Sequence, residues 1–159
     1  MNNTRPSLNK LRVWMITGKY HPIPGGAEIQ AQRLSRSLKD KGIKIRVVTF
    51  RSPGLPSSDY VDGIPVRRLN APYLKIRGQG IFVFYSSLVS LFYYLMRHRR
   101  EYDLLHVHLF YGHSFAAALA GRLANVPVLV KVGNTGYRLD PRVLAAKQPL
   151  GWFMAAYMR

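Results

Sequence analysis

Four short apolar runs, each rich in β-branched or aromatic residues, are spaced along the chain. They are "LRVWMITG" (11–18), "IKIRVVTF" (43–50), "YDLLHVHLF" (102–110) and "VPVLVKVG" (126–133). Runs of this length, bounded by glycine, proline and polar residues, are typical of buried strands. A shorter β segment, "YVDGIPVRRL" (60–69), contains a turn at Asp62 and Gly63.

Segments with helical spacing separate these strands. Apolar residues at Ala27, Ala31, Leu34 and Leu38 mark one helix face, and Gly42 ends that helix. Further helices are predicted at 81–96 and 112–124. Strands that alternate with helices predict an α/β fold, here a Rossmann-like, open, mostly parallel sheet with helices on both faces.

The uncharged stretch "IFVFYSSLVSLFYYLM" (81–96) is compatible with a membrane span or with a helix packed on the sheet. It is shorter than the roughly 20 residues that cross a bilayer. Ser86, Ser90, Tyr93 and Arg97 form a polar stripe at helical spacing. The pattern therefore favours a largely buried helix on the sheet.

The domain limits follow from these elements. We expect residues 1–10 to be a flexible N-terminal segment without the apolar core of a signal peptide. Residues 11–141 form the Rossmann-like domain in this scheme. Residues 142–159 are predicted to be a helical segment whose apolar side chains lead toward a second domain.

Charge narrows the range of partners. The 159 residues include 24 Lys and Arg against 7 Asp and Glu, a formal net charge of +17. Such a surface attracts nucleic acid, acidic lipid headgroups or phosphorylated small molecules. No nucleic-acid motif is present, which disfavours the first of these partners. The chain has no cysteine, which excludes disulfides and thiolate metal sites.

Three polar or glycine-rich clusters follow predicted strands: "YHPIPGGAE" (20–28), "HVHLFYGHS" (106–114) and "KVGNTG" (131–136). Ligands of open parallel sheets bind beyond the carboxyl ends of the strands, so we expect a site there. Gly25 and Gly26 precede a helix, where backbone N–H groups and the helix dipole favour an anion. A tight turn with close helix–sheet packing is the alternative.

His106 and His108 alternate on one strand and so face the same side. With His113 or His21 they form a candidate metal site, but nearby carboxylates are scarce, which disfavours it. We expect His108, at the strand end, to contact a ligand. His106 is expected to lie deeper, as a hydrogen-bonded core residue.

Three arginines, Arg97, Arg99 and Arg100, follow the apolar helix. They form either a solvated helix terminus or a contact with an acidic membrane.

The motifs "PGGAE", "DGIPVRRL", "YDLLHVH" and "VPVLVKVGNTG", in this order, resemble the N-terminal, acceptor-side domain of family 4 glycosyltransferases. That family has the two-domain GT-B fold, and the resemblance covers nearly the whole chain from Leu11. It implies a retaining, metal-independent transfer of a sugar from a nucleotide-sugar donor to an acceptor, either lipid-linked or a polysaccharide. No cofactor is implied, and the chain has no Asp-x-Asp metal motif.

The resemblance also implies residue roles. His108 matches a catalytic histidine that contacts the donor sugar, and Gly25 and Gly26 match a glycine pair beside the donor diphosphate. The residues implied to line the same cleft are His21, Asn134, Thr135 and Gly136. Many relatives carry a histidine about where Gly133 stands, which is a departure in this chain.

Members of that family bind the nucleotide mainly through a second Rossmann-like domain with two glutamates seven residues apart. The two glutamates of this chain, Glu28 and Glu101, both fall in the first domain. We therefore expect little transfer by the chain alone and the need for a separate C-terminal domain or subunit. The alternative function is a non-catalytic basic module that docks on an acidic membrane or a partner subunit. We expect a cytoplasmic protein, either free or peripheral at the inner membrane face.

Overall fold

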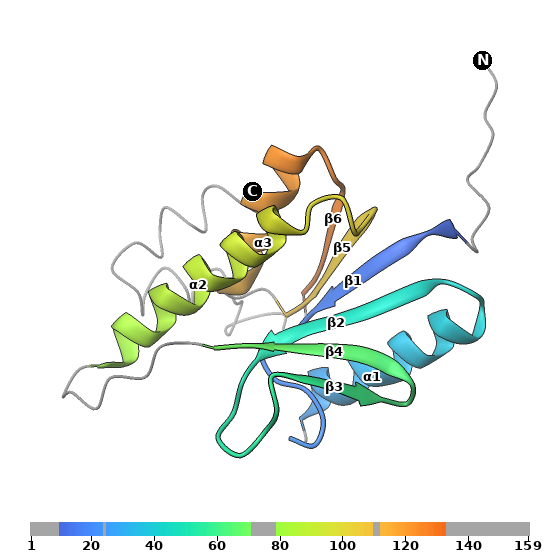
Figure 1. Ribbon diagram of the computed structural model, residues 1–159, viewed down its shortest axis with the longest axis horizontal. Helices are drawn as coiled ribbons and strands as arrows, with labels where there is room; N and C mark the ends of the chain where they lie inside the picture. The colour runs from blue at the N-terminus through green and yellow to red at the C-terminus, as the bar shows by residue number, and fades with distance from the viewer. Residues whose placement is uncertain (1–9, 24, 71–78, 110–111, 133–159) are drawn as a thin grey trace.

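The computed structural model describes residues 10–23, 25–70, 79–109 and 112–132 (Figure 1). Along the chain the elements are β1 (Arg12–Ile16), α1 (Gly26–Asp40), β2 (Lys44–Phe50), β3 (Ser58–Val61), β4 (Ile64–Leu69), α2 (Gln79–Arg97), β5 (Leu104–His108), α3 (Gly112–Ala124) and β6 (Val128–Lys131). Residues 1–9 of the predicted N-terminal segment 1–10, and the whole of the predicted helical segment 142–159, lie outside the described residues.

The strands form one sheet in the order β3-β4-β2-β1-β5-β6. All neighbours pair in parallel except β3, which is antiparallel to β4 at one edge. The direction of strand addition reverses between β1 and β5, because β2 and β4 lie on one side of β1 and β5 and β6 on the other. The predicted mostly parallel α/β fold is confirmed.

Side-chain alternation along the strands divides the core into two layers. Trp14 and Ile16 pack with buried residues of α2 and α3, whereas Val13 and Met15 pack with Ala31 of α1. Accordingly α1 covers one face of the sheet, and α2 and α3 cover the other (Figure 1). The prediction of helices on both faces is therefore also confirmed.

Turns form at the two places where the sequence predicted them, at Gly42 and at Asp62–Gly63. After α1, Gly42 has φ +83° and its N–H donates to the Lys39 carbonyl at 2.8 Å, which stops the helix. Asp62 and Gly63 between β3 and β4 have φ of 54° and 67°, the pair of positive values that a two-residue hairpin turn requires.

Helix α2 lies on the sheet as predicted, with an exposed face. Leu91 and Leu95 are buried, whereas Val89 and Tyr93 are 67% and 64% exposed. The helix extends slightly beyond the predicted range of 81–96 at both ends. Within the described ranges, no helix combines the length and the apolar character that crossing a bilayer requires.

Candidate active site

The carboxyl ends of β1 and β5 meet at the point where strand order reverses. β1 and β5 are in register up to Ile16 and Val107, and His108 pairs with Lys131 of β6. His108 therefore occupies the edge of the sheet at which open α/β folds bind their ligands.

His108 is a buried imidazole whose ring has no polar partner among the described residues. It is 1% exposed, and within the described residues neither of its ring nitrogens has a hydrogen-bond partner. Burial, followed by the nearby His106, Lys131 and His113, lowers the pKa of His108 to about 4. The ring is therefore neutral at pH 7, with one N–H donor and one acceptor. Leaving such a group unpaired costs about 1–3 kcal/mol, which a ligand hydroxyl could recover.

His106 is less buried than His108, so the prediction that it lies deeper is wrong. It is 8% exposed, and the two rings are 4.7 Å apart on the same face of β5, as their spacing predicted. In register beside His106 is Leu129, which is 53% exposed. The sheet is thus poorly covered at His106, whereas the carbonyl of His108 contacts His113 in the first turn of α3.

The first turn of α3 holds the end of β5. The Nε2 atom of His113 is 3.0 Å from the carbonyl oxygen of His108, and the Ser114 hydroxyl donates to the Leu109 carbonyl at 2.9 Å. A Cβ atom on Gly18, just after β1, would lie 3.8 Å from the His113 ring. The two hydrogen bonds join the end of β5 to α3 and fix the backbone that carries His108.

The glycine pair opens α1 at the same edge. Gly25 is the extended N-cap residue, without a side-chain cap, and a Cβ there would overlap the carboxylate of Glu28. A Cβ on Gly26 would have no heavy atom within 4 Å. Close packing therefore does not exclude a side chain at Gly26.

A hydrogen bond between side chains connects the start of α1 to the strand beside His108. The Nζ atom of Lys131 donates to Oε1 of Gln30 at 2.5 Å, and Gln30 lies about one helical turn after Gly26. Because Lys131 is the register partner of His108 in β6, the structure brings the glycine pair and His108 to one edge of the sheet.

His21 is held by a residue of the β3–β4 hairpin. Its side chain is exposed, and its carbonyl accepts a hydrogen bond from Nη2 of Arg68 at 2.8 Å. Arg68 also binds Asp59 of β3, so the structure places His21 beside the β3–β4 hairpin. The predicted cleft residues Asn134, Thr135 and Gly136 lie outside the described residues, as does Gly133.

Arg68 is a site-supporting residue that the sequence prediction missed. It is 1% exposed, its Nη1 lies 3.1 Å from Oδ2 of Asp59, and it fastens the loop that leads into Gly25. The pKa of Asp59 is lowered, first by the Tyr60 backbone N–H and then by Arg68. The sequence does carry a signal for this role. Side chains alternate between the two faces of a strand, so Arg68 lies on the same inward face of β4 as Ile64 and Val66.

A cavity of about 560 Å³ opens at the same edge, on the face of the sheet that α2 covers. Its lining includes Gly18, Phe50, Arg51, Asn70 and Phe84. A neighbouring groove of about 550 Å³ shares Asn70 and runs along α2, past Phe82, Val89 and Tyr93.

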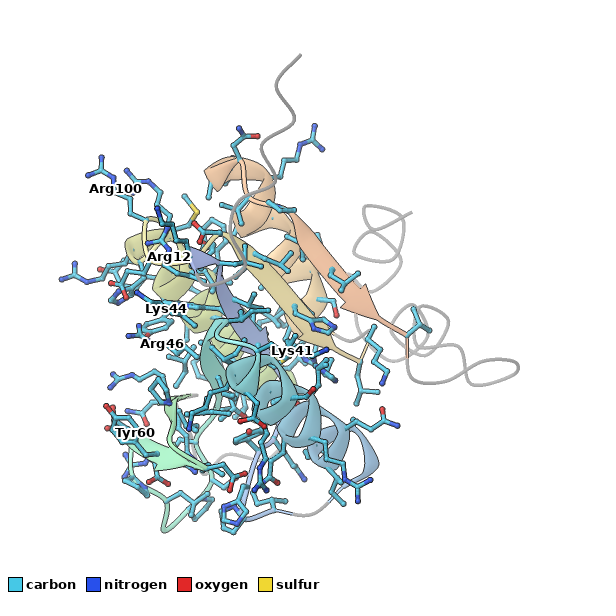
Figure 2. The ribbon with its side chains drawn as sticks, turned by 90° about the vertical axis from the view of Figure 1, so that its right-hand side faces the viewer. Arg12, Lys41, Lys44, Arg46, Tyr60 and Arg100 are labelled. Carbon is cyan, nitrogen blue, oxygen red and sulfur yellow. The ribbon has the colours of Figure 1, made fainter. Side chains whose placement is uncertain are left out.

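The three arginines predicted as a membrane contact lie at the opposite edge. Arg97, Arg99 and Arg100 are exposed at and just after the end of α2. Nη1 of Arg12, at the start of β1, donates to the Arg100 carbonyl at 2.6 Å. Figure 2 shows Arg12 and Arg100 together on this side of the molecule.

Among the described residues, no group of three or more histidine, aspartate or glutamate side chains is placed to hold a metal ion. Metal independence stays a prediction.

A model of the glycosyl transferase 4-like domain matches residues 25–159. The chain belongs to this family. It is 37% identical over 114 residues to a GDP-mannose:cellobiosyl-diphosphopolyprenol alpha-mannosyltransferase of Komagataeibacter xylinus, a match that covers 68% of this chain and 26% of the relative. It is 35% identical over 91 residues to a 2-deoxystreptamine N-acetyl-D-glucosaminyltransferase of Streptomyces fradiae, covering 53% and 21%.

The fold of this glycosyltransferase domain also matches solved structures. Sucrose-phosphate synthase of Thermosynechococcus elongatus aligns with a TM-score of 0.64 at 15% identity, over 94% of this chain and 40% of that one. The family model and the mannosyltransferase relative confirm the predicted family, and this structural likeness confirms the Rossmann-like, GT-B-type fold. The chain spans about a quarter of the length of the first curated relative and about a fifth of the second.

Proposed function

We propose that this glycosyltransferase domain is the acceptor-side half of a retaining, metal-independent enzyme that transfers a sugar from a nucleotide-sugar donor. The observation that supports this most is His108, a neutral, buried imidazole without partners in the described structure, at the same edge as the start of α1. A neutral imidazole suits a sugar hydroxyl, because it can both donate and accept a hydrogen bond.

The leaving diphosphate gains charge during transfer, and preorganised donors stabilise it most effectively. The backbone N–H groups at the start of α1 have this orientation, and Gly26 leaves the approach open. In this proposal Gly25 and Gly26 contact the diphosphate, and His108 contacts the sugar near the reacting carbon.

The acceptor, in the same proposal, enters the cavity at Phe50, Asn70 and Phe84. Its neighbouring groove, along α2, exposes the apolar side chains Phe82, Val89 and Tyr93. The polar part of a lipid-linked acceptor could bind the polar groups at the strand ends, and its lipid tail could pack on the apolar surface along α2. The lipid-linked class is therefore favoured over a polysaccharide.

The nucleotide itself requires a second domain or subunit with the glutamate pair. Determining the coding sequence after codon 159 tests this part directly. An open frame encoding a second α/β domain with two glutamates seven residues apart supports the proposal. A stop codon together with full transfer activity of the 159-residue chain contradicts it.

The alternative function, docking on an acidic membrane, is supported by a separate observation. Along α2 the exposed Phe82, Val89 and Tyr93 lead to the cationic Arg97 and Arg100. Apolar and basic groups in this arrangement bind anionic interfaces. Co-sedimentation with phosphatidylglycerol vesicles, but not with phosphatidylcholine vesicles, is the expected result, and equal binding to both would contradict it.

A further inference from the structure

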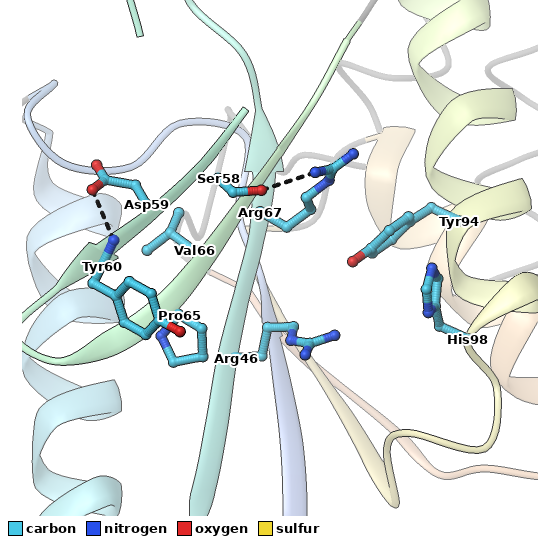
Figure 3. Close-up of a pocket in the computed structure, with 9 residues that line it drawn as sticks. All are labelled: Arg46, Ser58, Asp59, Tyr60, Pro65, Val66, Arg67, Tyr94 and His98. Atoms are coloured by element: carbon cyan, nitrogen blue, oxygen red, sulfur yellow. Dashed lines mark hydrogen bonds between the residues drawn. The ribbon is translucent and has the colours of Figure 1, made fainter. Parts of the chain in front are cut away.

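A separate cavity of about 410 Å³ lies away from the carboxyl edge, and it is called here the Arg46–Arg67 groove. Its lining residues come from β2, β3, β4 and the end of α2: Arg46, Ser58, Asp59, Tyr60, Pro65, Val66, Arg67, Tyr94 and His98 (Figure 3). Arg46 lies near the start of β2 and His98 just after the end of α2, so the groove is toward the amino edge.

Two guanidinium groups in the groove are supported by aromatic rings. Arg46 stacks over Trp14 at 5.0 Å from the ring centroid, and Arg67 over Tyr94 at 5.9 Å. A guanidinium that stacks in this way keeps its in-plane N–H groups available for a carboxylate or phosphate. In Figure 3 both side chains extend toward the part of the groove beside Tyr94 and His98.

Of the two arginines in the groove, Arg67 is the one without a carboxylate partner among the described residues. Its Nη1 donates to the Ser58 hydroxyl at 2.9 Å, and within the described residues it forms no ion pair. Its Nε is buried and has no acceptor there. A buried donor without a partner is unfavourable, so an anion that lets the guanidinium turn toward it would restore a hydrogen bond.

The nearby carboxylates are already engaged. One carboxylate oxygen of Glu101 lies 2.8 Å from Nη1 of Arg46, and the other lies 2.7 Å from Nδ1 of His98. Both oxygens are therefore already paired. Asp59 binds the buried Arg68. Lys44, Arg12 and Arg100 lie on the same side of the molecule as Arg46 (Figure 2) and add to the attraction of an anion.

The other side of the groove suits a sugar ring. Tyr60 is 75% exposed and lies beside Pro65, across from Tyr94 and His98 (Figure 3). Exposed tyrosine rings pack well against the apolar face of a pyranose, and hydroxyl groups such as that of Ser58 can bond its hydroxyls. We propose that the Arg46–Arg67 groove binds a monosaccharide that carries one anionic group, a phosphate or a carboxylate, at a site separate from the carboxyl edge.

The test is a titration of the 159-residue chain, followed by the amide and arginine Nε–H signals in NMR spectra. The probes are glucose 6-phosphate, glucuronate, unmodified glucose, inorganic phosphate and AMP. We expect saturable shifts at Arg67 and Tyr60 with one or both of the first two probes. Binding of glucose, phosphate and AMP should be at least about tenfold weaker. Comparing glucose 6-phosphate with glucuronate tells which anionic group is preferred.

Matched variants separate the groove from general positive charge. Arg67→Gln should weaken binding at least about tenfold, whereas Arg97→Gln, the same charge change outside the groove, should alter it less than about twofold. Tyr60→Ala removes an exposed ring without disturbing the core and should also weaken binding. Equal effects of the two arginine variants on affinity would overturn the proposal, and so would phosphate or AMP binding as tightly as the sugar ligands. Chemical-shift changes confined to Gly26 and His108, or binding that does not saturate below roughly 10 mM ligand, would also overturn it.

Discussion

Replacing Gly26 with alanine separates a ligand-binding role from a packing role for the glycine pair. The new methyl group would have no heavy atom within 4 Å, and the backbone at Gly26 does not have positive φ. Alanine is favoured over glycine by up to about 1 kcal/mol inside a helix, and by less at its first position. We therefore expect Gly26→Ala to stabilise the fold by about 0.5 kcal/mol, a rise in Tm of roughly 1–2 °C.

The same methyl group would occupy the space in front of the first backbone N–H groups of α1. If the donor diphosphate approaches there, the affinity for a nucleotide sugar should fall at least about tenfold, which corresponds to about 1.4 kcal/mol. Stability and binding thus change in opposite directions, and loss of fold cannot produce that combination.

Gly121→Ala provides the control for packing. A Cβ there would overlap the Val128 side chain and come within 2.8 Å of the Val126 carbonyl oxygen. Overpacking of this kind costs about 1–3 kcal/mol, so Tm should fall by roughly 2–12 °C. Thermal unfolding by circular dichroism measures stability. Calorimetric titration of the gene product, together with its donor-binding domain or subunit, with a nucleotide sugar measures affinity. A Gly26→Ala variant that is destabilised as much as Gly121→Ala, or that binds the donor normally, would refute the reasoning.

Two further predictions concern buried polar groups. Folding lowers the pKa of His108 to about 4, from about 6.5 in the unfolded chain. Between these two pH values the unfolded chain binds a proton at His108 and the folded chain does not. The free energy of unfolding therefore falls as the pH drops from about 6.5 to about 4. Urea unfolding should show that wild type loses about 2 kcal/mol more than His108→Gln between about pH 7 and pH 5, and equal losses would contradict the burial of a neutral ring. Arg68→Met should cost about 2–4 kcal/mol and speed amide hydrogen exchange in residues 18–23, with β5 unaffected. Unchanged exchange there would show that Arg68 does not hold the loop.

The sheet and its helices could be predicted from sequence because each element carries its own signal. Residues 13–16 of β1 are apolar on both faces of the sheet, as a central parallel strand must be, and the Asp62–Gly63 pair specifies the turn between β3 and β4. Arg68 could not be interpreted in this way. A charge on an inward face is stable only with partners, and those are supplied by Asp59 and the distant His21 carbonyl.

The candidate site was predictable in its location but not in its local environment. From the sequence, the ends of the predicted strands and the glycine pair indicated one edge of the sheet, and the structure places His108 and Gly26 at that edge. The relative burial of His106 and His108 depends on which helices reach over β5, and a strand pattern does not contain that information. The Arg46–Arg67 groove was missed because its residues come from four separate elements.

The most direct test of the central claim is transfer activity of the gene product with its donor-binding domain or subunit, compared between wild type and His108→Ala. His106→Ala, on the same face of the same strand, serves as the control. We predict that kcat/KM falls at least about a hundredfold for His108→Ala with the fold intact, and by much less for His106→Ala. Full activity of a folded His108→Ala enzyme would contradict the assignment of this edge as the site of sugar transfer.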